Sequence, residues 1–587
     1  MNAPLLEIRN LSTNFTTDIG KIVAVNDVSF TLNYGETVGI VGESGSGKSV
    51  TALSIMRLLS KNGTTTAGEI DFHNREKQKI NLLSIPEKEL QKYRGNEIAM
   101  IFQEPMTSLN PVLSCGIQVA EALILHKNLS KQESKKRTLE LFEKVKLPRA
   151  NKLFDAYPHQ LSGGQKQRVM IAMAISCDPA ILIADEPTTA LDVTVQKTIL
   201  DLLQQLQLEN KMSMIFISHD LAVISKIADR VLVMYKGNLV ESGTTSEILN
   251  EPKHAYTKAL LACRPPLNKR IYRLPTLSDF MKENSDGTFL EIKKSAVDSV
   301  KELEVSMSEF DARRKKLFSQ EPILQIKNLN TWFPIRNGIF GKTTDYIKAV
   351  NDVSFDVYPG ETLGLVGESG CGKTTLGRSI IRLIEPTSGQ VIFKKKDFAT
   401  IEGKELRRMR KHIQMIFQDP YSSLNPKMTI GEAIMEPMQV HDLYENDTIR
   451  KMKVYDLLNR VNLNESHFNR YPHEFSGGQR QRVCIARALA SQPEFIICDE
   501  SVSALDVSIQ AQILNLLNEL KRDFNFTCIF ISHDLSIVKF MSDRMIVMNE
   551  GQIEEIGDPE VIYKSPKSDY TRRLIEAIPE MVSTFQL

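Results

Sequence analysis

The feature that most constrains this chain is an internal duplication. The segment AVNDVSF occurs at residues 24–30 and again at 349–355, and ETVGIVGESGSGKS at 36–49 matches ETLGLVGESGCGKT at 361–374. The match extends to the far end of each copy, where AYTKALLA stands against DYTRRLIE. A chain of 587 residues with such a repeat is predicted to fold as two similar domains.

The repeat also sets the predicted domain boundaries. One domain is placed at residues 1–264, a linker at 265–321 and a second domain at 322–587, which ends in a short tail. The linker begins with two prolines and continues as a charged stretch with weak helical periodicity. We interpret it as a plain tether, with a functional linker helix as the alternative.

Composition narrows the class of protein. The chain has 73 basic and 72 acidic side chains, a balance that argues against a protein dominated by nucleic-acid binding. No apolar run approaches the roughly 18 residues that a membrane-spanning helix needs. The seven cysteines are scattered and form no CxxC pair, so a reduced compartment without disulfides or a metal cluster is expected.

Apolar runs and helical patterns alternate within each copy. Residues 180–186 and 213–220 are short apolar runs typical of fully buried strands. Their alternation with helical segments predicts an α/β fold with a largely parallel central sheet. Some antiparallel strands are expected on the N-terminal side of that sheet.

A glycine-rich loop in each copy predicts a phosphate site. GESGSGKS at 42–49 fits G-x-x-x-x-G-K-[ST] between an apolar run and a helical pattern, so its backbone N–H groups can converge on phosphate oxygens. Each lysine reaches the phosphates, and Ser49 or Thr374 can ligate Mg²⁺. Phe15 and Phe333 precede the loops, and each either stacks on an adenine ring or belongs to the core. The predicted phosphate-binding residues are Gly42, Glu43, Ser44, Gly45, Ser46, Gly47, Lys48, Ser49, Gly367, Glu368, Ser369, Gly370, Cys371, Gly372, Lys373 and Thr374.

Two acidic side chains end an apolar run in each copy. Asp185 and Glu186 follow one predicted strand, and Asp499 and Glu500 follow its counterpart. Acids at the carboxyl end of a parallel strand lie at the ligand-binding crevice. The aspartates are expected to hold Mg²⁺, directly or through water, and the glutamates to orient or deprotonate the attacking water.

Histidine and glutamine recur beside these acids. His219 and His533 each end a predicted strand, and we expect them to contact the γ-phosphate, although a lone histidine is usually structural. Gln103 and Gln418 follow apolar runs. From their chemistry alone, each glutamine either contacts Mg²⁺ or the water, or belongs to a surface loop.

A second glycine-containing turn carries no lysine. LSGGQKQRVMIAMA at 161–174 and FSGGQRQRVCIARA at 475–488 share ten of fourteen residues. A Ser-Gly-Gly turn that runs into a helix is an anion site, because its backbone N–H groups and the helix dipole attract negative charge. The residues alone do not say which anion these turns bind.

Taken together, the motifs resemble those of ATP-binding subunits of ATP-binding-cassette (ABC) transporters, with two cassettes fused. The resemblance rests on the Walker A loops, the glutamines, the LSGGQ signature turns, the Walker B strands, the switch histidines and the ALD segments at 190–192 and 504–506. It implies two tandem ABC-type P-loop NTPase domains, each with a RecA-like core, an antiparallel β part and a helical subdomain. It also implies ATP and Mg²⁺ as ligands.

In this family the signature turn of one cassette closes over the nucleotide held by the other. The resemblance therefore implies composite sites, and retention of the motifs in both copies implies two competent ones. It assigns nucleotide contacts to Ser162, Gly163, Gly164, Gln165, Ser476, Gly477, Gly478 and Gln479.

The subgroup is suggested by SLNP after the glutamine, by ALDVTVQ and ALDVSIQ, and by the terminal YTKALLA. These stretches are similar to the dipeptide and oligopeptide import group, whose members import peptides, glutathione or nickel. The resemblance implies two permease subunits, an extracytoplasmic binding protein and a peripheral position on the cytoplasmic face of the inner membrane. Only Cys263 occurs where some members carry a cysteine-rich segment, so no iron–sulfur cluster is expected, and no nucleic-acid partner.

Three other functions compete with this interpretation. A soluble twin-cassette ATPase acting on ribosomes or nucleic acid typically has arginine after the switch His-Asp, whereas both copies here read SHDL. A DNA-repair ATPase would carry zinc-binding cysteines. A scaffold with degenerate sites is disfavoured because both copies keep every motif.

Overall fold

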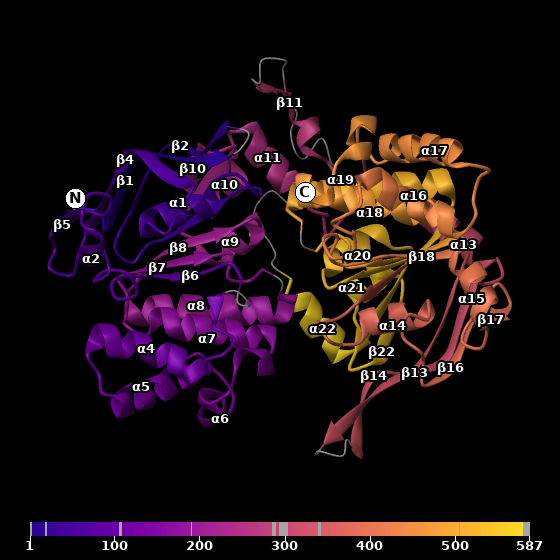
Figure 1. The fold of residues 1–587 in the computed structure, drawn as a ribbon, viewed down its shortest axis with the longest axis horizontal. Helices are drawn as coiled ribbons and strands as arrows, with labels where there is room; N and C mark the ends of the chain where they lie inside the picture. The colour runs from indigo at the N-terminus through magenta and orange to yellow at the C-terminus, as the bar shows by residue number, and fades with distance from the viewer. Residues whose placement is uncertain are drawn as a thin grey trace.

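The two copies form two lobes that lie side by side, with the N-terminal lobe in indigo to magenta and the C-terminal lobe in orange to yellow (Figure 1). The computed structural model describes residues 3–17, 20–104, 108–189, 191–283, 289–292, 303–337, 342–503 and 505–578. Ala190 and Ala504 of the ALD segments, parts of the linker and the C-terminal tail lie outside the described residues.

Each lobe contains a six-stranded, mostly parallel sheet and a four-stranded antiparallel sheet. In the first lobe the orders are β10-β9-β3-β8-β7-β6 and β2-β1-β4-β5, and only β10 runs antiparallel in the larger sheet. The strands are β1 (Leu6–Thr17), β2 (Gly20–Leu32), β3 (Thr37–Val41), β4 (Gly63–His73), β5 (Lys79–Asn81), β6 (Ile98–Ile101), β7 (Ile181–Asp185), β8 (Ser213–Ser218), β9 (Arg230–Tyr235) and β10 (Asn238–Thr244). Every residue of β3, β7 and β8 is buried, as expected for short apolar runs.

The second lobe repeats both sheets. Its orders are β18-β19-β20-β15-β21-β22 and β14-β13-β16-β17, so the predicted α/β fold with a largely parallel central sheet is confirmed in both copies. The strands are β13 (Leu324–Asn337), β14 (Lys342–Val357), β15 (Thr362–Val366), β16 (Ser388–Phe393), β17 (Lys396–Asp397), β18 (Ile413–Ile416), β19 (Phe495–Asp499), β20 (Thr527–Ser532), β21 (Arg544–Asn549) and β22 (Gln552–Gly557).

Helices cover the parallel sheets and form a separate helical part beyond them (Figure 1). In the first lobe they are α1 (Lys48–Met56), α2 (Glu87–Leu90), α4 (Cys115–Lys127), α5 (Lys131–Lys144), α6 (Ala150–Phe154), α7 (Gly163–Ile175), α8 (Val193–Asn210), α9 (Leu221–Ile227), α10 (Thr245–Asn250) and α11 (Ala255–Ala262). The linker holds β11 (Met281–Glu283), β12 (Phe289–Glu291) and α13 (Met307–Phe318). The second lobe has α14 (Lys373–Ile380), α15 (Gly403–Arg410), α16 (Ile430–Val440), α17 (Asp447–Arg460), α18 (Gly477–Leu489), α19 (Val507–Phe524), α20 (Leu535–Met541), α21 (Pro559–Lys564) and α22 (Asp569–Glu576).

Two hydrophobic cores stabilise each lobe. One fills the space between the antiparallel sheet and the parallel sheet, and the other lies between the parallel sheet and the helices on its opposite face. The parallel sheet is therefore buried on both faces, which is why its strands carry continuous apolar runs rather than alternating ones. This sandwich fixes the carboxyl ends of the strands, where the predicted site residues begin.

The described part of the linker packs against both lobes. Ile271 and Leu274 are buried in the core of the second lobe, whereas Phe280 and Met281 are buried in that of the first. The side-chain amide of Asn515 on α19 accepts from the N–H of Leu274 and donates to its carbonyl, both at 2.8 Å. The segment that we interpreted as a plain tether is therefore packed against both lobes over the residues described.

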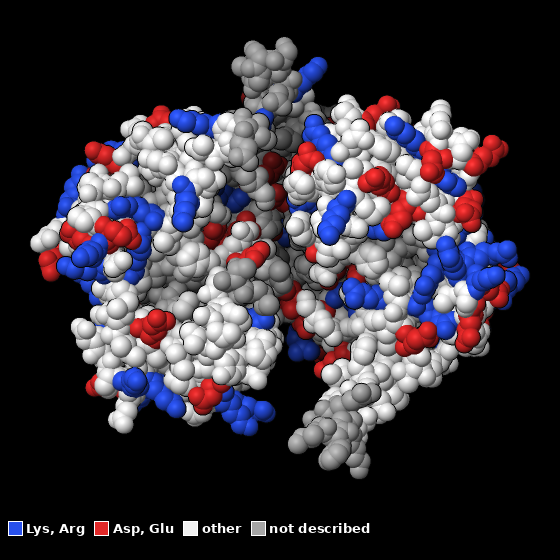
Figure 2. Space-filling view, in the orientation of Figure 1, with Lys and Arg blue, Asp and Glu red and all other residues white. Residues whose placement is uncertain are grey.

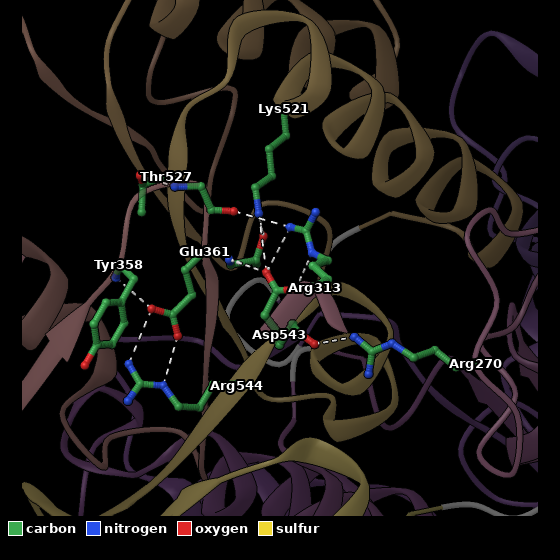
Figure 3. Close-up of polar contacts among 11 residues, drawn as sticks. Arg270, Arg313, Tyr358, Glu361, Lys521, Thr527, Asp543 and Arg544 are labelled. Carbon is green, nitrogen blue, oxygen red and sulfur yellow. Dashed lines mark hydrogen bonds and ion pairs between the residues drawn. The ribbon is translucent and has the colours of Figure 1, made fainter. Parts of the chain in front are cut away.

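A cluster of charges holds α13 on the second lobe (Figure 3). Arg313 Nε donates to Asp543 Oδ1 at 2.8 Å, and Lys521 Nζ lies 3.6 Å from Oδ2. Burial alone would raise the pKa of Asp543, but the two cations outweigh it and lower that pKa. Arg270, from an earlier part of the linker, donates to the backbone carbonyl that precedes Asp543. The first lobe has Gln207 in place of Lys521, so this charge arrangement belongs to the second lobe alone.

Replacing Asn515 tests the linker contact. Asn515→Asp keeps an acceptor for the N–H of Leu274 but places a carboxylate oxygen against its carbonyl, so a buried hydrogen bond is lost. We expect a loss of about 1–3 kcal/mol in the free energy of unfolding of the second lobe, measured from its thermal unfolding transition. The matched control is Asp201→Asn at the exposed equivalent position of the first lobe, which should change stability by less than about 0.5 kcal/mol. Equal effects of both substitutions would contradict the assigned role of the linker.

Candidate functional site

The glycine loops join a buried strand to a helix in both lobes, β3 to α1 and β15 to α14. Gly47 and Gly372, which precede the lysines, have φ angles of 99° and 107°. A Cβ there would lie 2.5 Å from the carbonyl oxygen of Ala24, or 2.0 Å from that of Ala349, so only glycine fits. The loop therefore wraps closely against its own antiparallel sheet.

Each loop lysine is folded back over its loop. Lys48 Nζ donates to the carbonyls of Gly42 at 2.7 Å and Glu43 at 2.9 Å, and Lys373 makes the equivalent two bonds. Lys48 is 5% exposed, and burial lowers its pKa even though acidic neighbours oppose the shift. A cation held at the mouth of a loop of backbone amides is suited to bind phosphate.

A hydroxyl and a carboxylate meet beside each lysine. Ser49 Oγ donates to Asp185 Oδ1 at 2.9 Å, and Thr374 Oγ1 donates to Asp499 Oδ1 at 2.9 Å. Burial raises the pKa of Asp185 to about 6, although the bond from Ser49 opposes the shift. Asp499 Oδ2 is buried and has no hydrogen-bond partner among the described residues. Mg²⁺ prefers carboxylate and hydroxyl oxygens as ligands, and these side chains supply both kinds. The unpartnered Oδ2 of Asp499 is one such oxygen.

In the first lobe Glu186 lies at the centre of a hydrogen-bonded cluster. Gln103 Nε2 donates to its carboxylate at 3.1 Å, Thr189 Oγ1 donates at 2.8 Å, and His219 Nδ1 lies 3.3 Å away. Lys48 Nζ lies 4.0 Å from the second oxygen. Burial would raise the pKa of Glu186, but His219 and the other donors outweigh it and lower that pKa to about 2. The predicted glutamate, glutamine and histidine are therefore brought together in one site.

The second lobe builds the same cluster with one donor fewer. Gln418 donates to the Glu500 carboxylate at 2.8 Å, and His533 Nδ1 lies 3.5 Å away. Ser503, the counterpart of Thr189, donates instead to the backbone carbonyl of Glu500 at 3.0 Å. The two glutamates thus have the same neighbours in kind but differ in how many donors hold the carboxylate.

Both glutamates have an unusual backbone. Glu186 and Glu500 each have a φ of 45°, in the left-handed region that residues with a Cβ rarely adopt. The N–H of each glutamate donates to a carbonyl of the neighbouring strand, Ile217 or Ile531, at 3.0 Å. The turn therefore bends sharply at the end of the strand and directs the carboxylate toward the glycine loop. Such local strain is commonly found at active sites.

The signature turns form the starts of α7 and α18. Ser162 Oγ accepts from the N–H of Gln165 at 3.3 Å, and Gln165 Oε1 accepts from the N–H of Ser162 at 3.1 Å. Ser476 and Gln479 form the same capping box. The intervening glycines are the first two residues of each helix, where a backbone N–H has no acceptor within the helix. Each predicted turn therefore lies at a helix start, and anion binding there stays a prediction.

The lobes meet through their glycine loops. Ser44 Oγ in the first loop donates to Asp506 Oδ1 of the second lobe at 3.0 Å. Thr194 Oγ1 of the first lobe donates to Glu368 Oε1 in the second loop at 2.6 Å. Each loop thus contacts the segment at the start of α8 or α19 in the opposite lobe. The two cassettes of one chain therefore face each other.

A cavity of about 250 Å³ lies at the second glycine loop. It is lined by Ala349, Ser369, Gly370, Gly372, Lys373, Thr374, Thr375, Gln418 and Glu500, all from the second lobe. Among the described residues, the signature turn of the first lobe is not part of that lining. Closure of each signature turn over the opposite loop therefore stays a prediction.

The two aromatic candidates lie on equivalent strands, β1 and β13. The ring of Phe15 covers Gly63, where an added Cβ would lie 2.7 Å from it, and Phe333 is 39% exposed. Neither side chain is fully buried in the core, so the stacking role remains open as a prediction. Thr189, which donates to Glu186, was not among the predicted residues, because a threonine three residues past the acid carries no motif of its own.

Comparison with known proteins identifies two matching families. The family model for "ABC transporter" matches residues 25–189 and 350–503. The family model for "Oligopeptide/dipeptide transporter, C-terminal region" matches residues 240–286 and 555–586. The matches fall in both copies, so the duplication includes the C-terminal region as well as the cassette.

Similar proteins match along almost the whole chain. The chain is 48% identical over 581 residues to "Glutathione import ATP-binding protein GsiA" of Shigella sonnei, and equally identical to that of Escherichia coli K12. It is 47% identical over 577 residues to that of Pectobacterium atrosepticum. Each match covers 98% of this chain and 89% of the relative. A solved dimeric structure of the bacterial ABC transporter cassette MJ0796 is 30% identical, covers 41% of this chain and 98% of that chain, and has a TM-score of 0.37.

Among the residues that the structure describes, no helix is long and apolar enough to cross a membrane.

The contact between His219 and Glu186 predicts a measurable titration. Burial would lower the pKa of His219, but Glu186 outweighs burial and raises it. The pair therefore stabilises the fold below about pH 6.5, the ordinary histidine value, and this stabilisation is lost as pH rises through the raised pKa. Glu186→Gln removes the anion, so the pKa of His219 should fall below its ordinary range in a histidine-selective NMR titration. His126, whose pKa burial lowers at a distance from this site, should titrate as before. An unchanged His219 would show that the pair does not form.

Proposed function

Because this chain belongs to the ABC transporter family of ATP-binding proteins, we propose that it supplies the ATP hydrolysis that drives import of glutathione or another small peptide. The chain is an ATPase. The observation that carries the proposal is the convergence, in both lobes, of a loop lysine, two strand-end acids, a glutamine and a histidine. The relatives named for glutathione import support the substrate class, since they match along 98% of this chain.

The matches favour transport over an ATPase acting on ribosomes or nucleic acid. The surface agrees with this preference, because acidic and basic side chains are interspersed over the face shown in Figure 2. A nucleic-acid groove would need a continuous basic surface. The proposed units are two cassettes at residues 1–264 and 322–587, joined by the linker at 265–321.

In each site the glutamate orients or deprotonates the water that attacks the γ-phosphate. The groups around each glutamate lower its pKa, to about 2 for Glu186, which makes the carboxylate a weak base near neutral pH. His219 and Gln103 must therefore leave Glu186 when ATP binds, and they then contact the γ-phosphate and the water. His533 and Gln418 do the same for Glu500. Binding of ATP thereby frees the base only when there is a phosphate to attack.

Mg²⁺ is the proposed metal partner of ATP. Ser49 and Asp185 would hold it in the first lobe with Gln103 nearby. Thr374, Asp499 and Gln418 would do so in the second. When bound, Mg²⁺ neutralises charge on the phosphate oxygens. The hydroxyl–carboxylate pairs already stand 2.9 Å apart, so the protein keeps these ligands ordered without further rearrangement.

ATP is proposed to close the two cassettes on each other. One site then joins Lys48 and Glu186 to the signature turn that begins at Ser476, and the other joins Lys373 and Glu500 to the turn at Ser162. The free amides of Gly163, Gly164, Gly477 and Gly478 would donate to the γ-phosphate, and the serines and Gln165 and Gln479 would shape each turn. The facing glycine loops support this pairing, because each already contacts the opposite cassette.

Transport requires further chains. The proposed partners are two permease subunits and an extracytoplasmic solute-binding protein, with this chain attached to the cytoplasmic face of the inner membrane as a peripheral subunit. The import relatives support this assignment. When ATP closes the cassettes on each other, the permeases would move from one state to the other. The presence of the γ-phosphate would decide which of the two states is favoured.

Pairs of substitutions test the composite sites. Glu186→Gln with Ser476→Ala changes one proposed site only, so phosphate release should equal that of Glu186→Gln alone. Glu186→Gln with Ser162→Ala changes both sites, and release should fall to the level of Glu186→Gln with Glu500→Gln, about 10²–10⁴ below the unchanged chain. The two serines are matched, since each caps an equivalent helix. The reverse ranking would place each signature turn in the site of its own cassette.

Uptake measurements test the substrate. Cells that carry Glu186→Gln with Glu500→Gln in place of the unchanged chain should lose uptake of radiolabelled glutathione, and the unchanged chain should restore it. A labelled dipeptide, supplied in parallel, separates glutathione import from general peptide import. If uptake of both compounds is unaffected while the purified chain hydrolyses ATP, the import assignment is wrong and the ATPase assignment stands.

A further inference from the structure

Each glycine loop donates a backbone N–H to a tyrosine that belongs to none of the ATP-binding motifs. The backbone N–H of Glu43 donates to the phenolic oxygen of Tyr256 at 2.9 Å, and that of Glu368 donates to the phenolic oxygen of Tyr570 at 3.0 Å. These tyrosines lie on α11 and α22, inside the segments that match the C-terminal region of oligopeptide and dipeptide transporters. A region outside the cassette motifs thus reaches the ATP loop in both lobes.

The tyrosines are held rigidly. Tyr256 is fully buried, its ring lies 4.3 Å from that of Tyr235 between centroids, and Tyr570 is 8% exposed. Each helix is pinned to the last strand of its sheet by an acid. Thr257 Oγ1 donates to Glu241 on β10, and the N–H of Ser568, which caps α22, donates to Glu555 on β22 at 3.5 Å. The phenolic oxygens are therefore fixed points against which the loops can be placed.

The side chains of the loop glutamates, Glu43 and Glu368, reach the opposite cassette. Ser508 Oγ, on α19 of the second lobe, donates to Glu43 Oε1. Thr194 Oγ1, on α8 of the first lobe, donates to Glu368 Oε1 at 2.6 Å. The arrangement is reciprocal, so each loop glutamate is held through its N–H by its own C-terminal region and through its carboxylate by the partner cassette.

We infer that Tyr256 and Tyr570 are positioning residues of the two ATP sites, acting through Glu43 and Glu368. Each phenolic oxygen accepts a hydrogen bond from a loop N–H and so holds that peptide unit in one orientation. This orientation gives the loop the shape that binds phosphate and reaches the opposite cassette. The inference rests on the proposed ATPase sites and deepens them, because it makes the C-terminal region part of each site.

The loop geometry explains why this contact matters. The carbonyl of Glu43 already accepts from Lys48 Nζ at 2.9 Å, so the peptide units on both sides of Glu43 are held by hydrogen bonds. Loss of the tyrosine oxygen leaves a partly buried N–H without an acceptor, and the peptide then rotates to find one. Rotation moves the loop amides that receive phosphate and withdraws the carboxylate from Ser508.

Tyr256→Phe in a Glu500→Gln background isolates the first site and removes only one oxygen atom. We expect KM for ATP to rise about tenfold with kcat changed less than about twofold, because a binding loop is displaced while the reacting groups stay. Ser508→Ala should raise KM in the same direction, and the double variant should be no worse than Tyr256→Phe alone, since both act on Glu43. Tyr570→Phe in a Glu186→Gln background should repeat the result at the second site.

Tyr272→Phe is the matched control, since this linker tyrosine is 56% exposed. It should leave KM and kcat unchanged. Thermal unfolding of each variant checks that the ring packing is kept. An unchanged KM in Tyr256→Phe with an intact fold, or additive effects of Tyr256→Phe and Ser508→Ala, would overturn the inference. If the Glu500→Gln and Glu186→Gln chains, each with one intact site, hydrolyse no ATP, the proposed function is wrong instead.

Discussion

Each ATP site depends on a buried glutamate that needs several hydrogen-bond donors. Glu186 is 7% exposed, and a carboxylate so placed is stable only when it is paired. Its donors come from three places: Gln103 after β6, Thr189 after β7 and His219 after β8. Because these strands run parallel and adjacent, their carboxyl ends lie at one edge of the sheet. The strand order, buried on both faces, is thus what assembles the reacting groups.

The two sites offer the same reactive groups on different supports. Thr189 donates to its glutamate carboxylate, whereas Ser503 donates to a backbone carbonyl. Pro187 follows Glu186, and Ser501, whose buried hydroxyl has no partner among the described residues, follows Glu500. These differences lie in the turns that carry the glutamates. Both copies therefore keep the same candidate side chains. The turns that carry Glu186 and Glu500 differ in the hydrogen bonds that hold each glutamate.

Two kinds of contact join the cassettes. The glycine loops meet the opposite lobe through single polar side chains, as in the bond between Ser44 and Asp506. The linker instead buries apolar side chains in both cores and binds Asn515 through its backbone. A contact through a single hydroxyl is easily exchanged, whereas buried apolar surface is costly to separate. The contacts of the linker are thus the stable part of the interface between the lobes, and the contacts of the glycine loops are the part that can change.

The duplication and the α/β fold could be predicted from local periodicity and short motifs, and the same motifs selected the candidate site residues. A run such as 180–186 must be a buried strand, and the acids that end it must then lie at the sheet edge. Contacts between distant parts of the chain became visible only in the folded structure. Tyr256 reaches the glycine loop from 213 residues away, and Asn515 binds the linker from 241 residues away. Such contacts depend on how the elements pack in space, and no local pattern records which distant side chain will supply the missing acceptor or donor.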